Sequence, residues 1–574
     1  MVTGSHPVNN QSSAKVGAAG GAQLSQETEG DTTAVATGDA PSIARPATRS
    51  SAVSFGRSAA IVGAAFIVSR VLGLIREVIF AHRFGTSAEL DAYISAFRIP
   101  DLLFLVVMSG AFGSAFIPVF GGYLARGERE HAWRLASAVI TLTATVAIVL
   151  GTVILVFADP IMRYVVAPDL SPEAHRLATQ MMRLLLLSPI LLGLGIAAKG
   201  ILEAQDLFTL PALAPVLYNI AIILAALLLA PHWGIQGVAI GVITGAALHV
   251  AVQVPGLVHT GLRFRPTWSR TTPGLATVAR LLAPRVIGQA AFQINFIAVN
   301  HFAAALGEGR VSGLNYAWQI MMLPHGVLAL SISTVVFPTM ARAYEHGDLD
   351  TVSATFAKAL TPLLFLILPA SVGLFELRTA IIQSVFQTGA FGVTSTSLVT
   401  EPLAFLALGL SAYAVVEVLA RTFYALQDTK TPVVTGIAII IVNIVLGAIL
   451  SSRIGHAGLA IALSVSTGIE AVALFALLRR RIDGLGAEFA WWFTRVALAT
   501  AVMALVVAAM RPRLEAATAP GAGSRLLQLG LLALAVLTAA WAYALAAKVL
   551  RIPEIDAFYA RLKRIMPARL ATWM

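Results

Sequence analysis

Charged side chains recur in a part of this sequence that is otherwise apolar enough to cross a lipid bilayer. Between residues 69 and 120 they include Arg70, Arg76, Glu77, Asp91 and Arg98. An ionised group in hydrocarbon is costly, so such residues normally face the interior of a helix bundle or a water-filled cavity. The sequence therefore predicts a polar cavity between membrane-spanning helices.

Two polar stripes at helical spacing would line this cavity. The first comprises Arg70, Gly73 and Glu77, and the second comprises Asp91, Ser95 and Arg98. Arginine suits a diphosphate because its planar fork of donors binds oxyanions in pairs and stays charged. The alternative is structural: Arg70 with Glu77, or Asp91 with Arg98, would only neutralise each other between packed helices.

The composition defines the class of protein to which these stripes belong. Of 574 residues, 57% are hydrophobic and only 12% are charged, which indicates a polytopic membrane protein. The net charge of +11 comes from Lys and Arg in short loops, as in the cytoplasmic loops of membrane proteins, so no nucleic-acid partner is expected. The absence of cysteine excludes disulfides and thiolate metal sites. We predict neither a metal site nor a cofactor.

With about 20 apolar residues per span, the chain predicts an all-α fold of about fourteen transmembrane helices. Their ranges are 58–81, 91–121, 133–157, 177–204, 212–231, 234–258, 275–306, 311–342, 353–376, 398–427, 431–451, 456–478, 489–510 and 524–549. Lys and Arg concentrate on one side if the N-terminus is cytoplasmic, so both termini are predicted to be cytoplasmic.

The two ends of the chain differ from the spans in composition. Residues 1–56 are rich in Gly, Ala, Ser and Thr and predict a disordered cytoplasmic tail. Residues 551–574 predict a cytoplasmic amphipathic helix that lies on the inner headgroups. A merely solvated basic end is the alternative for this second tail.

An internal repeat divides the spans. Three features recur about 220 residues apart: Gln205-Asp206 and Gln427-Asp428, Gly234-x-x-Gly237 and Gly455-x-x-Gly458, and Pro118 and Pro338. Residues 57–270 and 271–483 are therefore predicted to be two six-helix repeats, helices 1–6 and 7–12, around a central cavity, as in transporters whose site lies between two halves. Residues 484–550 add two further helices.

Other polar residues are secondary candidates for binding. Lys199 and Arg421 occupy equivalent places near the inner ends of the fourth and tenth spans, and the alternative is that they extend to the headgroups. Gln319 and Glu77 are also candidates, although polar groups of this kind often bridge packed helices. The chain carries no Walker A, HExxH or GxSxG motif, so we expect a transporter and not an enzyme.

Several segments carry a family resemblance: SRVLGLIRE (Ser69–Glu77), DAYISAFRIPDLL (Asp91–Leu103), GAFGSAFIPVF (Gly110–Phe120) and the two Gln-Asp turns. They resemble the MurJ/MviN lipid II flippase family, within the multidrug/oligosaccharidyl-lipid/polysaccharide exporter superfamily. The resemblance implies a multi-pass, alternating-access transporter of the bacterial inner membrane. Such a protein turns a polyprenyl-diphosphate-linked disaccharide-pentapeptide from the inner to the outer leaflet for cell-wall synthesis, alongside cell-wall synthesis proteins.

The resemblance also implies binding residues. The cavity arginines of the family on the first helix match Arg70 and Arg76, and its acid on the second helix matches Asp91. Ser69 and Arg98 fall on positions that are polar in the family. These five residues are the predicted substrate-binding set.

Two other arginines of the family are replaced here, by Phe104 and Gln319. Either Lys199, Arg421 or Arg98 compensates for the lost charge, or the chain moves a different lipid-linked substrate. The acidic sodium ligands that some members carry on the seventh and eleventh helices are absent too, which leaves membrane potential or protons as the driving force.

Three interpretations stay open. The leading one is a flippase of a lipid-linked glycan, most simply lipid II, with helices 13 and 14 forming a groove for the polyprenyl tail. The second is a small-molecule antiporter of the same superfamily, or a flippase of another lipid-linked oligosaccharide. The third is a non-transporting scaffold of the cell-wall machinery. Helices beyond the twelfth, and arginines in place of acids in the cavity, favour the first.

Overall fold

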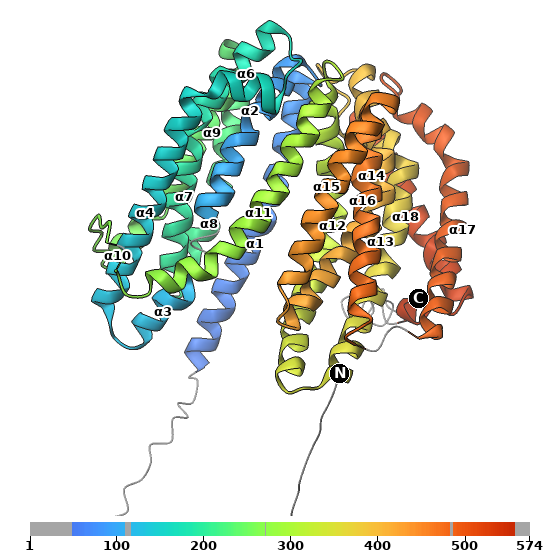
Figure 1. Cartoon of the computed structure of the whole chain (residues 1–574). Coiled ribbons are helices and arrows are strands. Elements are labelled where there is room, and N and C mark those ends of the chain that lie inside the picture. The colour runs from blue at the N-terminus through green and yellow to red at the C-terminus, as the bar shows by residue number, and fades with distance from the viewer. Residues whose placement is uncertain (1–48, 110–115, 270, 483–485, 557–574) are drawn as a thin grey trace, which may run out of the picture. The chain divides into compact units, whose positions relative to one another are not determined.

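A computed structural model describes residues 49–109, 116–269, 271–482 and 486–556 of this protein, and helices are the only regular secondary structure in these ranges (Figure 1). By its contacts the chain divides after Phe55, and the account below concerns the unit that begins at Gly56. The predicted tails, residues 1–56 and 551–574, lie largely outside the described residues, although the first helix begins at Arg49.

In the first part of the chain, the described residues form ten helices and two π-helical turns. They are α1 (Arg49–Phe84), α2 (Ala88–Leu103) with the π-helical η1 (Phe104–Ser109), α3 (Ile117–Ala125), α4 (Arg129–Val156), α5 (Ala158–Ile161) with the π-helical η3 (Met162–Val166), α6 (Pro172–Leu185), α7 (Leu187–Glu203), α8 (Thr209–Leu228), α9 (Ala230–Ala251) and α10 (Val254–His259).

In the second part, the described residues form eight helices. They are α11 (Leu275–Ala304), α12 (Arg310–Glu345), α13 (Leu349–Val385), α14 (Val393–Ala425), α15 (Lys430–Ile454), α16 (His456–Leu478), α17 (Ala487–Thr518) and α18 (Arg525–Val549). Side-chain caps mark several starts, because a Ser or Asp oxygen accepts a hydrogen bond from the first helical turn: Ser87 for α2, Ser171 for α6, Asp348 for α13 and Ser524 for α18.

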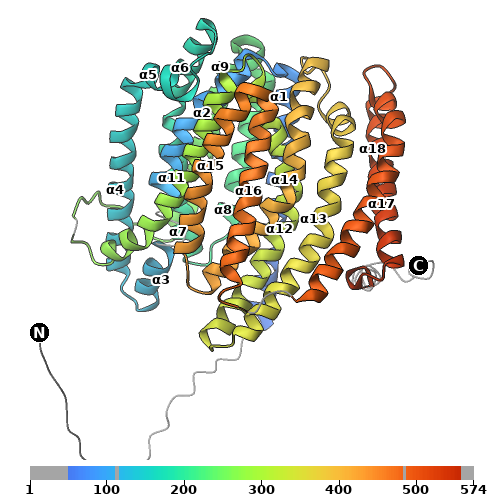
Figure 2. The ribbon, with the colours of Figure 1, turned by 45° about the vertical axis from the view of Figure 1, so that its right-hand side comes forward.

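The helices from α2 onward form two groups (Figures 1 and 2). In the first group, α7 and α8 pack on α9, and α6 packs on α2. In the second group, α12, α13 and α16 pack on α14, while α17 and α18 pack on α13 at the flank. α11 contacts both α2 of the first group and α15 of the second, and α1 runs between the two groups in Figure 1.

Eleven helical segments of the described chain are long and apolar enough to cross a membrane. This confirms the predicted class, an all-helical polytopic membrane protein. The three remaining predicted spans coincide with α1, with α2 and η1, and with α11, so a total of fourteen stays a prediction.

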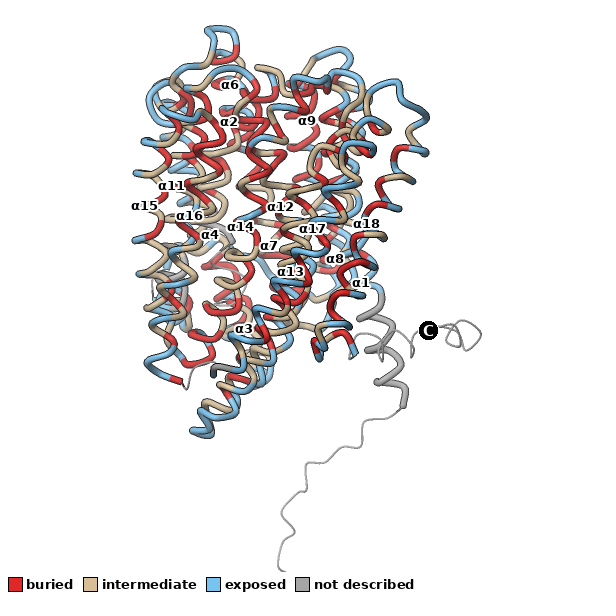
Figure 3. Tube along the Cα trace, turned by 90° about the vertical axis from the view of Figure 1, so that its right-hand side faces the viewer, coloured by how far each residue is buried: buried red, intermediate tan, exposed pale blue. Residues whose placement is uncertain are grey.

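Small residues allow close helix packing inside both groups. A Cβ added at Gly241 of α9 would collide with Ala225 of α8, and one added at Gly409 of α14 would collide with Ser464 of α16. Close approach of backbones through small residues is how helices associate in membranes, where apolar surface alone gives no driving force. Buried residues accordingly line the faces where helices meet (Figure 3).

Similar backbone geometry recurs at two pairs of positions within the predicted repeat, which itself stays a prediction. Gly234 (φ 54°, ψ −145°) separates α8 from the main part of α9, and Gly455 (φ 70°, ψ −148°) separates α15 from α16. Asp206 (φ 60°) and Gln427 (φ 57°) are left-handed at the ends of α7 and α14. By backbone conformation, Asp206 therefore corresponds to Gln427. The sequence repeat instead aligned Asp206 with Asp428, one residue further along.

Candidate functional site

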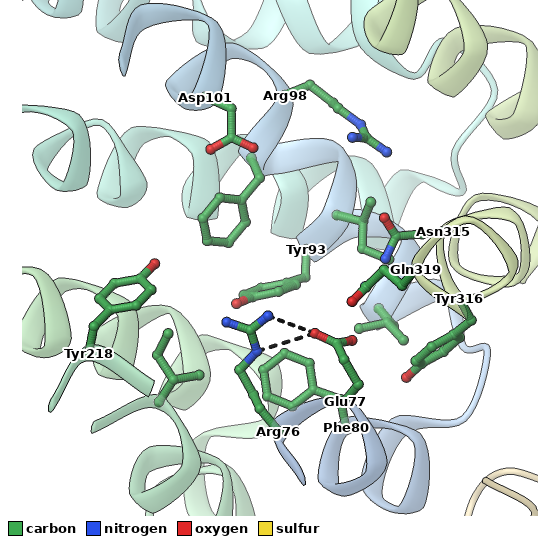
Figure 4. Close-up of a pocket in the computed structure, with 14 residues that line it drawn as sticks. Arg76, Glu77, Phe80, Tyr93, Arg98, Asp101, Tyr218, Asn315, Tyr316 and Gln319 are labelled. Carbon is green, nitrogen blue, oxygen red and sulfur yellow. Dashed lines mark hydrogen bonds and ion pairs between the residues drawn. The ribbon is translucent and has the colours of Figure 1, made fainter. Parts of the chain in front are cut away.

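Two adjoining cavities lie between α1, α2, α8 and α12, and together we call them the central cavity. The first has a volume of about 230 Å³ and the second about 440 Å³. Five residues line both of them: Arg76, Glu77, Tyr218, Tyr316 and Gln319. The predicted polar cavity is therefore present, and helices from both groups build its wall (Figure 4).

Arg76 is tied to two neighbours at the boundary between the cavities. Its Nε and Nη2 donate to Oε1 of the buried Glu77, at 3.2 and 2.8 Å, and its Nη1 donates to Oδ1 of Asn219 on α8 at 3.2 Å. These bonds engage three of the five N–H donors of a guanidinium. The charge of Arg76 is thus largely balanced by Glu77 before any ligand arrives.

Arg70 lies in the second cavity, nearer the N-terminal end of α1, together with Ser69. Its side chain is exposed, and its guanidinium carbon lies 5.2 Å from the centre of the Phe66 ring. The predicted alternative pair of Arg70 with Glu77 does not form here, because Glu77 binds Arg76. Among the described residues Arg70 has no ion pair, so its charge is available to a ligand.

The hydroxyl of Ser69 is held in place by α8. It accepts a hydrogen bond from Nδ2 of Asn219 at 3.3 Å, and the same amide donates to the carbonyl of Pro215 at 3.0 Å. Asn219 therefore links Ser69 and Arg76 on α1 to one position of α8.

Arg98 lies at the other end of the first cavity. Its Nε donates to Oδ1 of Asn300 on α11 at 3.1 Å, and its guanidinium carbon lies 5.6 Å from the ring centre of Phe296. Asp101 lines the same cavity, one turn further along α2, and Figure 4 shows both side chains at one end of it. The alternative pair of Asp91 with Arg98 does not form.

Asp91 is placed away from the central cavity, with 1% of its surface exposed. Its carboxylate accepts from the N–H groups of Gly309 at 2.6 Å and Ser312 at 2.7 Å, and so caps the start of α12. In return, Oε1 of Glu308 accepts from the N–H of Ala88 at the start of α2, at 2.9 Å. This exchange of caps ties the two helix groups together, which is a structural role that the prediction of substrate binding did not include.

The secondary candidates are divided by the structure. Gln319 lines both cavities. Lys199 is half exposed, 3.7 Å from Glu203, and Arg421 donates to Glu417 at 2.7 Å. Neither Lys199 nor Arg421 lines the central cavity. Of the three residues expected to compensate for the missing arginines, only Arg98 lies there.

Sequence reasoning missed several residues of the wall: Tyr93, Asp101, Tyr218 and Tyr316. Asp101 had a signal, since it continues the helical spacing of the stripe that ends at Arg98. The tyrosines had none, because an aromatic residue in an apolar span gives no indication of the direction in which it points. Phe104, at a family arginine position, packs with Leu103 beside an apolar cluster.

The described residues contain no group of His, Asp and Glu side chains that could hold a metal ion. The cavity instead presents arginine guanidinium, amide and phenol groups, together with the carboxylates of Glu77 and Asp101. The guanidinium groups can bind an anionic part of a ligand. The amide, phenol and carboxylate groups can form hydrogen bonds with polar groups attached to it.

Comparison with known proteins gives the following relatives. A family profile described as "Lipid II flippase MurJ" matches residues 80–524. A lipid II flippase MurJ of Burkholderia cenocepacia is 32% identical over 72% of this chain and 82% of its own length. A probable lipid II flippase MurJ of Rhizobium tropici is 30% identical over 88% of this chain and 96% of its own.

Solved structures of similar fold include two transporters. One is described as lipid II flippase MurJ in an inward closed conformation, with a TM-score of 0.72, 25% identity, and coverage of 85% of this chain and 99% of that one. The other is an inward-facing transporter of the MATE family, in the MOP superfamily, with a TM-score of 0.63, 18% identity, and coverage of 72% and 94%. The second likeness concerns the fold alone.

Proposed function

This chain belongs to the lipid II flippase MurJ family, and from that premise we propose that it carries lipid II from the inner to the outer leaflet of the bacterial inner membrane. The diphosphate of the lipid binds in the central cavity, and the sugar and peptide occupy the polar space around it. The observation that carries the proposal is the wall itself: three arginines, Arg70, Arg76 and Arg98, face cavities built between the two helix groups.

The three arginines contribute unequally. Arg76 is already paired with Glu77, so Arg70 and Arg98 supply most of the free positive charge. A hydrogen bond between charged groups is worth about 1.5–3 kcal/mol, and a guanidinium can place two of them on one phosphate. Gln319 adds an uncharged polar group to the wall where the family has an arginine.

Transport requires the cavity to open to each side of the membrane in turn, and one end is closed in this structure. There the reciprocal caps of Asp91 and Glu308 join α2 to the start of α12, and Thr86 contacts Ser395 at 2.9 Å. Towards the other end the cavity is open, since the side chain of Arg70, which lines it, is exposed. With both termini cytoplasmic, the closed end faces outward and the open end receives lipid from the inner leaflet.

The polyprenyl tail stays in hydrocarbon while the head group crosses. We assign it to the surface of α17 and α18, where Leu505, Leu526 and Leu537 are more than half exposed. These helices pack on α13 at the flank of the second group, so a tail lying there would remain connected to a head group in the cavity.

Complementation tests the proposal directly. Cells depleted of their own flippase should grow when this full chain is expressed, and vesicles made from them should expose labelled lipid II in the outer leaflet. A variant with Arg70→Ala and Arg98→Ala should reach the membrane at the same level without supporting growth. Growth with this double variant would contradict the assignment of the diphosphate site.

A second candidate substrate, another lipid-linked oligosaccharide, is favoured by one observation. Phe104 and Gln319 stand at two arginine positions of the family, so the cavity holds less positive charge than is usual there. Vesicles that flip a labelled lipid-linked oligosaccharide without the peptide, but not lipid II, would decide for this candidate.

A further inference from the structure

A separate polar cavity, of about 870 Å³, lies outside the central cavity. It is found at the start of α4, against the connection between α10 and α11. It shares no lining residue with the central cavity. Four arginines and one glutamate line it, together with hydroxyl groups of Ser and Thr. The charged members are Arg129, Arg134, Arg263, Arg265 and Glu130.

The connection is fixed along α4 by a row of hydroxyl groups spaced four residues apart. The N–H of Arg265 donates to Oγ of Ser137 at 3.1 Å, and the N–H of Thr267 donates to Oγ1 of Thr141 at 3.2 Å. The indole N–H of Trp268 donates to Oγ1 of Thr145 at 3.2 Å. The backbone that carries the arginines is therefore held in one place.

The charges around this cavity are only partly balanced by ion pairs among the described residues. Arg134 pairs with Glu130 at 2.5 Å. Among the described residues, Arg129, Arg263 and Arg265 have no ion pair. These three arginines are exposed around one cavity and give it a positive field that attracts an anion, and arginine binds phosphate oxygens in particular.

Exposed aromatic rings lie on the same connection. Trp268 is 62% exposed and Phe264 is 46% exposed, and Figure 2 shows the connection standing out to the side of α4. Trp is enriched where a membrane protein crosses from headgroups to acyl chains. Thr145, which binds Trp268, lies about 12 Å further along α4 than Ser137, at 1.5 Å per residue. The arginines thus lie near the start of α4, at the level of the headgroups. The indole ring lies further along α4, nearer the acyl chains.

We propose that this cavity binds the phosphate headgroup of an anionic phospholipid, with the acyl chains lying against Trp268 and Phe264. Basic pockets beside membrane helices on the cytoplasmic side recognise such headgroups through charge and hydrogen bonding. The site is separate from the transport cavity, so it neither depends on the proposed function nor supports it.

Fluorescence quenching tests the site in the intact protein. The full chain is placed in phosphatidylcholine nanodiscs that contain a minor fraction of brominated phosphatidylglycerol or, for comparison, brominated phosphatidylcholine. The fluorescence of Trp268 is obtained by subtracting the fluorescence of the Trp268→Phe variant from that of the natural chain. We expect a clear preference of this signal for the anionic lipid. Equal quenching by both lipids would overturn the proposal.

Two arginine variants identify the groups responsible. Arg263→Gln with Arg265→Gln should weaken the preference about fivefold for each arginine removed. The matched control, Arg479→Gln with Arg480→Gln, removes two exposed arginines beyond α16 and should leave it unchanged. Equal loss in both variants would show a general surface charge and contradict the site. Tight binding of soluble glycerol phosphate in detergent, without lipid preference in nanodiscs, would also overturn it.

Discussion

Arg70 and Arg76 lie on the same helix, six residues apart, yet their surroundings differ. Arg76 is held by Glu77 and Asn219, while Arg70 contacts the ring of Phe66 and has no ion pair among the described residues. Helical spacing predicted that Arg70 and Glu77 share one stripe. It could not predict that Glu77 pairs instead with Arg76, its neighbour in the sequence.

Residues from distant segments complete the site and were therefore harder to predict. Asn219 connects α8 to both Arg76 and Ser69, which precede it by 143 and 150 residues. Asp101 follows Arg98 at helical spacing and could have been found from the sequence.

Substitution of Arg70 should impair transport more than stability. Arg70→Ala removes the most accessible cation of the second cavity, and we expect about a ten- to hundredfold loss of lipid II flipping in vesicles, from the value of a charged hydrogen bond. Arg70→Lys should recover little, since an ammonium lacks the bidentate fork. Arg83→Ala, on the same helix but outside both cavities, is the control. Normal flipping by Arg70→Ala at normal abundance would refute its role.

At the level of elements, hydrophobic runs predicted the helices well, because about 20 apolar residues must cross the bilayer wherever they occur. Helix ends and interruptions were less predictable. The predicted span 177–204 is divided into α6 and α7 at Leu186, and the span 91–121 contains the π-helical η1. Such breaks depend on local hydrogen bonding and not on hydropathy.

Asp91 shows that contacts between elements, like helix breaks, could not be predicted from the local sequence. Its place on one stripe with Ser95 and Arg98 suggested a cavity acid, but its carboxylate caps α12. A carboxylate next to a helix start accepts from the free N–H groups there and is favoured by the helix dipole. Nothing local to residue 91 indicates that the start of a helix more than 200 residues away lies beside it.

Neutralising this cap should loosen the closed end. Asp91→Asn leaves only one acceptor oxygen for two N–H donors, and loss of a cap costs about 0.5–2 kcal/mol. We expect labelling of a cysteine introduced at Gln319 by an impermeant maleimide, added from outside the cell, to rise by about two- to thirtyfold. Glu89→Gln, in the same turn of α2, is the control. Unchanged labelling with Asp91→Asn would show that the cap does not hold this end closed.

Small residues should matter where α8 meets α9. Gly241→Ala would place a methyl group against Ala225, so the helices must separate, and overpacking of this kind costs about 1–3 kcal/mol. The control is Gly468→Ala on α16, where an added Cβ would have no other atom within 4 Å. Both substitutions replace a helical glycine by alanine, so both gain the same helix propensity. Thermal unfolding in detergent should therefore give a lower midpoint for Gly241→Ala than for Gly468→Ala. Equal midpoints would mean that this contact can relax freely.

On the scale of the whole molecule, the two helix groups meet closely at the closed end. Glycines permit this approach: a Cβ at Gly85 would lie 2.5 Å from the carbonyl oxygen of Ala390, and one at Gly309 would lie 2.7 Å from that of Thr86. Gly309 also has a left-handed φ of 78°, which favours glycine. Opening must separate these surfaces and break the hydrogen bonds across them.

A reversible crosslink across this end should stop transport. The hydroxyl oxygens of Thr86 and Ser395 lie 2.9 Å apart, on opposite sides of the closed end, so cysteines at both positions can form a disulfide. The chain has no other cysteine, which leaves a single bond to form. Oxidised Thr86→Cys with Ser395→Cys should lose lipid II flipping, and a reducing agent should restore it.

The control for this crosslink lies inside one helix group. Ser371 on α13 and Ser411 on α14 have hydroxyl oxygens 2.8 Å apart, so their cysteine pair would form an equally short bond that spans no gap between the groups. If the groups move as units, Ser371→Cys with Ser411→Cys stays active when oxidised, because alternating access changes contacts between the groups and not within them. Inhibition by both disulfides would indicate that the second group itself bends, whereas full activity with the Thr86 and Ser395 crosslink would exclude opening at this end.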